Sequence, residues 1–197
     1  MSWVGIILIF ALVDNVILSR LLGIYPRVGG AGKMRAALSI GVSTAVLMGI
    51  SALAGWAIDA LVLDPLQLGF LRTPAFVLSV AGLAFFLEAM AARLSPVLVR
   101  GSGFSLPGVA INCATLGIVL ITTRGGYTAA ESLIAGLAAG LGFMLVRVLM
   151  GAISERLEIE RIPRALRGFP LELISAGLMA YAFMAFDRAF LARILGG

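Results

Sequence analysis

The residue of this chain best suited to redox or metal chemistry is Cys113, its single cysteine, which directly follows Asn112. A cysteine thiolate can bind iron, and such ligation needs hydrogen-bond donors and close backbone approach around the sulfur. Pro107, Gly108 and Gly117 surround the pair and weaken the helical pattern there, which favours that approach. The alternative is a cysteine that packs as a small apolar side chain without a chemical role. The residues alone leave both interpretations open.

A lone cysteine restricts what Cys113 can do. It cannot form a disulfide within the chain, and it supplies at most one ligand to a metal ion or cluster. Any iron centre that includes Cys113 must therefore be shared with another chain. The sequence contains no histidine, so histidine-based acid–base catalysis and histidine metal sites are excluded.

Three ionisable residues, Asp14, Arg20 and Glu88, fall within or close to apolar stretches. A charge inside a bilayer is expensive unless it is paired or hydrated, so such residues indicate an ion path or a subunit contact. Asp14 and Arg20 are six positions apart, nearly opposite on an unbroken helix, and can pair directly only if the helix breaks. Glu88 lies a little over one turn before Arg93, and a simple interfacial ion pair is the alternative there.

The elements that carry these residues are membrane spans. Of the 197 residues, 61% are hydrophobic and only 13% are charged, whereas soluble domains have about 45–50% apolar and about 25% charged residues. The net charge of +5 results from 15 basic and 10 acidic residues, and the basic ones are scattered rather than gathered on one face, which excludes a nucleic-acid binder. The first residues lack the features of a cleaved signal and are interpreted as the start of a retained span.

Six stretches are long and apolar enough to cross a bilayer, for which about 20 residues are needed. They are residues 3–22, 35–61, 73–92, 106–122, 129–154 and 171–190. The loops between them are short and rich in glycine and proline, so none could hold a soluble domain. We therefore predict an all-α, polytopic membrane protein in which residues 1–197 form a single membrane domain.

The basic residues predict the orientation of the chain, because they favour the cytoplasmic side of a membrane. Ten of them lie at the ends of spans one, three and five, against four on the opposite side, which also carries Asp59 and Asp64. Both termini are thus expected on the outer side.

Two of the spans are expected to be broken helices. The first carries Asp14 and Asn15, and the fourth carries Asn112 and Cys113 between helix-breaking residues. The two breaks are three spans apart, so the halves 1–100 and 101–197 would have opposite topology, as in inverted three-helix repeats with a site near the membrane midplane. In span five, the small residues at 135–142 place glycines four apart, which predicts close helix packing.

Several short motifs occur in a fixed order along the chain. They are Val-Asp-Asn at 13–15, Leu-Leu-Gly at 21–23, Leu-Arg-Thr at 71–73, Phe-Leu-Glu at 86–88, Ser-Pro-Val-Leu at 95–98, Asn-Cys-Ala at 112–114, Glu-Arg-Leu at 155–157, Arg-Gly-Phe-Pro at 167–170 and Ser-Ala-Gly-Leu-Met at 175–179. In this order they resemble the A-type membrane component of the Rnf ion-translocating electron-transport complex. They equally resemble its counterpart, the E-type component of the sodium-translocating NADH:quinone oxidoreductase. The resemblance extends from about residue 13 to 187.

The resemblance implies a six-helix subunit in the cell inner (cytoplasmic) membrane of a bacterium. Its partners would be the other Rnf-type subunits, above all a homologous E-type membrane subunit of opposite orientation. A 2Fe–2S cluster between the two subunits would receive two cysteines from each. The whole complex would couple ferredoxin and NAD redox chemistry to sodium or proton movement, and this chain would not be catalytic alone.

The chain departs from the family at one expected ligand. The family motif Leu-Gly-x-Cys-Pro reads Leu-Gly-Ile-Tyr-Pro at 22–26, so Tyr25 replaces one cysteine, while Cys113 matches the second and Asn112 is its neighbour. A phenolate is a harder and more basic ligand than a thiolate, so a changed or absent cluster is expected rather than tyrosine ligation.

Two alternatives to the electron-carrying subunit follow. One is a cofactor-free ion-path or transporter-like subunit that uses Asp14, Arg20 and Glu88, which Tyr25 favours. The other is a structural scaffold, in which the loss of Cys113 affects assembly alone.

Overall fold

The computed structural model describes residues 3–20, 22, 33–94, 113–159, 163, 166 and 168–184. Every regular element within these residues is a helix, and they contain no strand. The all-α prediction is confirmed for this part of the chain. Tyr25 and Asn112 lie outside it.

The first span is divided into helical segments. Helix α1 (Trp3–Leu8) continues into the π-helix η1 (Ile9–Val13), and helix α2 (Val16–Arg20) follows after a two-residue interruption. The π-turn closes with a 2.7 Å hydrogen bond from the Asp14 N–H to the Ile9 carbonyl. The predicted break in the first span is therefore present, at Asp14 and Asn15.

Three of the predicted spans contain helices long and apolar enough to cross a membrane, within Gly41–Leu63, Gly69–Leu87 and Ala129–Leu157. The first consists of most of α3 (Lys33–Ile58) with the π-helix η2 (Asp59–Leu63). The second joins the 3-10 turn η3 (Gly69–Leu71) to α4 (Arg72–Leu94), and the third belongs to α8 (Ala129–Ile159).

The other predicted spans correspond to shorter apolar helices in the described residues, Trp3–Val13, Cys113–Arg124 and Pro170–Phe183. The last two belong to α7 (Cys113–Arg124) and α9 (Phe169–Phe183). The remaining parts of spans four and six, residues 106–112 and 185–190, lie outside the described residues.

Helix α8 begins at a reciprocal cap. The Thr128 N–H donates to the Glu131 carboxylate over 3.0 Å, and the Glu131 N–H donates to the Thr128 hydroxyl over 3.4 Å. This Thr-x-x-Glu pattern is a capping box, which satisfies backbone donors that the first turn leaves without helical partners.

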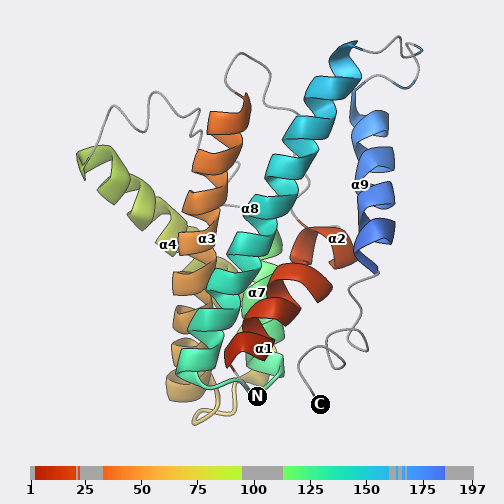
Figure 1. Ribbon diagram of the computed structural model, residues 1–197. Coiled ribbons are helices and arrows are strands. Elements are labelled where there is room, and N and C mark those ends of the chain that lie inside the picture. The colour runs from red at the N-terminus through yellow and green to blue at the C-terminus, as the bar shows by residue number, and fades with distance from the viewer. Residues whose placement is uncertain are drawn as a thin grey trace.

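Helices α3 and α8 form the antiparallel centre of the molecule (Figure 1). A β-carbon placed on Gly136 would lie 2.6 Å from the Met48 carbonyl oxygen, and one on Gly140 would overlap Ala45. Only glycine allows the two backbones to approach this closely. The predicted packing role of the small residues at 135–142 is therefore confirmed.

The buried core lies where the first helix, α7 and α8 meet. Phe10, Val16, Ile118 and Phe143 are all at most 2% exposed and belong to one cluster. At its edge the rings of Phe10 and Tyr127 make an edge-to-face contact, with centroids 6.0 Å apart. Packing around the broken helix is thus dense, although the helix itself is interrupted.

Candidate functional site at the broken first helix

Asn15 connects the two segments of the first helix. Its side chain is fully buried, its Nδ2 donates to the Ala11 carbonyl at 3.1 Å, and its Oδ1 accepts from the Ile17 N–H at 3.1 Å. The oxygen caps α2, as asparagine does at many helix N-termini. The amide nitrogen satisfies a carbonyl in the segment before the break. One side chain therefore serves both broken ends.

Asp14 and Arg20 meet across the break. Their Oδ2 and Nη2 atoms are 3.6 Å apart, and the side chains are 21% and 46% exposed. On the same turn, the Ser19 hydroxyl donates to the Val13 carbonyl at 3.1 Å. The pairing that the sequence allowed only for a broken helix is present.

Helix α8 accommodates the break at Gly142, near the middle of that helix. A β-carbon there would lie 2.7 Å from the Ala11 carbonyl oxygen and 2.8 Å from Asn15 Nδ2. In Figure 1, α1 crosses the lower half of α8 and α2 lies at about its mid-height. The break therefore sits midway along the longest helix of the described chain.

The second segment of the first helix packs on α7, the helix that begins at Cys113. A β-carbon on Gly117 would lie 2.8 Å from Leu22 Cδ1 and 4.0 Å from Val16 Cγ1. Ala114 is completely buried, whereas Cys113 itself is exposed. The thiol thus stands at a surface of this chain, one turn from the contact with α2.

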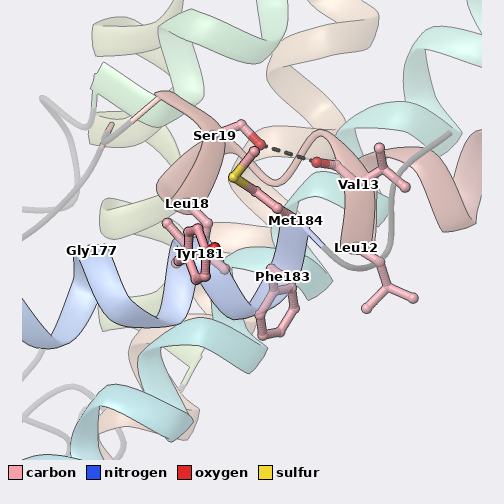
Figure 2. A pocket seen from close by; sticks show the side chains of 9 residues that line it. Leu12, Val13, Leu18, Ser19, Gly177, Tyr181, Phe183 and Met184 are labelled. Atoms are coloured by element: carbon pink, nitrogen blue, oxygen red, sulfur yellow. Dashed lines mark hydrogen bonds between the residues drawn. The ribbon is translucent and has the colours of Figure 1, made fainter.

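An apolar cavity of about 420 Å³ lies beside the break, between the first helix and α9. Its lining residues are Leu12, Val13, Leu18, Ser19, Gly177, Ala180, Tyr181, Phe183 and Met184 (Figure 2). The Ser19 hydroxyl is already bonded to Val13 inside this lining, which leaves mainly aliphatic and aromatic surface toward the cavity.

A separate charged cluster lies at the turn between α3 and α4. Arg72 Nε contacts Asp59 Oδ1 and Arg72 Nη2 contacts Asp64 Oδ1, both at 2.6 Å. The η2 turn and the reversal of the chain bring these residues together. The sequence predicted Asp59 and Asp64 on the outer side of the membrane but did not predict their pairing with Arg72.

Most of the chain is similar in sequence to known membrane proteins. The family described as Rnf-Nqr subunit, membrane protein, matches residues 3–189. The chain belongs to the Rnf-Nqr family. It is 39% identical over 187 residues to the A-type component of the Na(+)-translocating ferredoxin:NAD(+) oxidoreductase complex of Acetobacterium woodii, covering 95% of this chain and 97% of the relative. It is 41% identical over 176 residues to the A-type component of the ion-translocating oxidoreductase complex of Escherichia fergusonii, covering 89% and 91%.

The structure brings some of the predicted Rnf-Nqr site residues together. Asp14 and Arg20 form one pair, and Cys113 lies on the neighbouring helix α7. Glu88 belongs to α4, but its side chain lies outside the described part of the structure, as do Tyr25 and Asn112. Their predicted roles stay predictions.

Sequence reasoning missed the parts that Asn15 and Gly142 play at the site of this Rnf-Nqr chain. An asparagine followed by an apolar run is a helix N-cap signal, which could have identified the Asn15 acceptor. The small residues at 135–142 predicted close helix packing around Gly142, but the sequence does not identify Ala11 as its contact, because that contact is distant along the chain.

The donor set of this Rnf-Nqr chain limits which cofactor it can hold. No group of three or more His, Cys, Asp or Glu side chains comes together within the described residues, and the whole chain has one cysteine. The resemblance implies that each subunit supplies two cysteine thiolates to the cluster, and this chain has only one cysteine. The chain can supply at most one thiolate, that of Cys113, which is exposed at the start of α7.

Proposed function

We propose that this chain is the A-type membrane subunit of an Rnf-like complex that couples electron transfer between ferredoxin and NAD to ion movement. The observation that carries the proposal is the match over about nine-tenths of the chain to A-type components of ion-translocating oxidoreductases. The three long apolar helices and the shorter ones beside them agree with a protein that acts inside the bilayer.

The proposed architecture is six spans arranged as two inverted repeats, with both termini on the outer side of a bacterial inner membrane. The central pair supports it, because α3 with η2 contains 26 and 5 residues and the antiparallel α8 contains 31. Matching central helices that run in opposite directions are what an inverted repeat requires. The proposed partner is a homologous E-type subunit of opposite orientation.

Cys113 is proposed to donate one thiolate to an iron–sulfur site shared with that partner. Its exposure at the start of α7 supports this role, because a ligand shared between chains must be reachable from outside its own chain. The remaining ligands would have to come from beyond the described residues or from the partner.

The decisive experiment is electron paramagnetic resonance and iron analysis of the intact purified complex, with wild-type, Cys113→Ser and Tyr25→Cys chains compared. A wild-type signal that Cys113→Ser removes or shifts supports the ligand role. An unchanged signal in Cys113→Ser refutes it. A signal created only by Tyr25→Cys would mean that this chain no longer holds the cluster.

The second candidate is a cofactor-free ion-path subunit. The Asp14–Arg20 pair at mid-height of α8, together with the single cysteine, favours it. In that case Asp14→Asn should reduce ion flux into vesicles and leave any redox spectrum of the complex intact. If the chain is a structural scaffold, replacing Cys113 should impair only the assembly of the complex.

A further inference from the structure

We propose that Asn15 is a positioning residue. Its amide holds the first helix in two segments and thereby fixes where α2 docks on the N-terminal part of α7, the helix that starts at Cys113. The consequence for Cys113 chemistry rests on the proposed function, whereas the docking itself can be measured without it.

The Asn15 amide makes hydrogen bonds to both segments of the first helix. Its nitrogen donates to Ala11 and its oxygen accepts from Ile17, and no part of the side chain is exposed to solvent. A buried backbone group that loses its partner destabilises the conformation that exposes it. Without Asn15 the broken geometry therefore loses stability relative to a continuous helix.

The break in the first helix packs directly against Gly142 of α8. Gly142 lies where a β-carbon would be 2.7 Å from the Ala11 carbonyl, so the surface of α8 is shaped for the backbone at this point. Because α8 packs tightly on α3 through Gly136 and Gly140, the break is held at a fixed place relative to the central helix pair.

The break also determines how the second segment of the first helix meets α7. A continuous helix through Asp14 and Asn15 would rotate and redirect every later residue, since each residue turns an α-helix by about 100°. Leu22 would then leave Gly117, and Val16 would leave the cluster that contains Ala114. The contact between the second segment of the first helix and the N-terminal part of α7 thus depends on the Asn15 amide.

Cysteine cross-linking tests the docking directly. Leu22→Cys and Gly117→Cys are introduced into a Cys113→Ser chain, the whole complex is kept in its membrane, and the pair is oxidised with copper phenanthroline. Protection from a polyethylene-glycol maleimide reports bridge formation over time. We expect Asn15→Ala to slow bridging by roughly tenfold or more, because it removes both buried hydrogen bonds of the amide. Gly142→Ala should slow bridging as well, because its β-carbon would lie 2.7 Å from the Ala11 carbonyl oxygen.

Two further variants test whether the effect on bridging is specific to the Asn15 amide. Ser19→Ala is the matched control, because it removes a hydroxyl from the exposed side of the same break, and it should bridge at nearly the parental rate. Asn15→Ser replaces the separate donor and acceptor atoms of the amide by one shorter hydroxyl group, and should fall between the parent and Asn15→Ala. Parental bridging in Asn15→Ala overturns the proposal. If that chain does not accumulate, parental bridging in both Asn15→Ser and Gly142→Ala overturns it.

A spectroscopic measurement separates this inference from the proposed function. In complexes with Cys113 intact, Asn15→Ala should shift the line shape or midpoint potential of the signal that Cys113→Ser removes, with iron per complex unchanged. An unshifted signal refutes the link to Cys113. If the wild-type complex has no such signal, the proposed ligand role fails, while the cross-linking result still decides the positioning role.

Discussion

Asp14 and Arg20 contact each other across the interruption of the first helix, with 3.6 Å between the carboxylate and guanidinium atoms. They are six positions apart in the sequence, a spacing that would place them about 120° apart around the axis of a regular helix and on different turns. The contact thus exists only because the helix is broken, and it neutralises two charges in an apolar stretch.

Removing one member of this pair should destabilise the protein more than removing both. Asp14→Asn or Arg20→Gln alone takes the opposite charge away from the remaining member, which we expect to cost about 1–2 kcal/mol, less than for fully buried pairs because both side chains are partly exposed. The double variant should recover part of that loss. Thermal unfolding of the three purified variants gives the coupling, and strictly additive losses would contradict the pairing.

Glycines on α8 should differ in their tolerance of a methyl group. Gly136→Ala places a β-carbon against the Met48 carbonyl and should destabilise the protein by about 1–3 kcal/mol. Gly151→Ala, on the same helix, places it in open space and should stabilise by up to about 1 kcal/mol through helix propensity. Unfolding midpoints of the two variants provide the test. The prediction fails if both changes have the same sign.

The Arg72 cluster should depend more on Asp59 than on Asp64. The Asp59 side chain is 11% exposed and that of Asp64 is 61% exposed, so only the first pair is well shielded from water and salt. Asp59→Asn should lower the unfolding midpoint further than Asp64→Asn, and added salt should weaken the Asp64 contribution first. Arg72→Lys should also lower the unfolding midpoint, since a lysine ammonium group lacks the forked guanidinium group that reaches both carboxylates. Equal midpoints for the two aspartate variants would argue against this arrangement.

The capping box at the start of α8 gives a local prediction. Thr128→Ala removes the hydroxyl that accepts from the Glu131 N–H and should destabilise by about 1 kcal/mol. The control is Thr123→Ala, whose hydroxyl only bonds carbonyls of its own helix, and which should change stability less. Hydrogen exchange at the first turn of α8 should speed up in Thr128→Ala alone.

The sequence predicted those features of the fold that depend on local pattern. Long apolar runs identified α3, α4 and α8, and the polar pair Asp14 and Asn15 identified the break. What it could not predict depends on distant contacts: Gly142 matters because of Ala11, and Arg72 matters because the turn after α3 brings Asp59 to it. The chemistry of Cys113 stays a prediction, since its other ligands would belong to residues beyond those described or to another chain.

The π-turn η2 affects how relatives of this protein are compared. A π-turn holds one residue more than an α-helical turn, and η2 forms the last turn of this helix, where the Asp64 N–H donates to the Asp59 carbonyl over 2.9 Å. The residue that follows this turn is displaced around the helix axis by about 100° from the position that a regular helix would give. In a homologue that lacks this extra residue, the position aligned with Asp64 would no longer face the arginine that follows the turn. Alignments of this segment should therefore place their gap between residues 59 and 63.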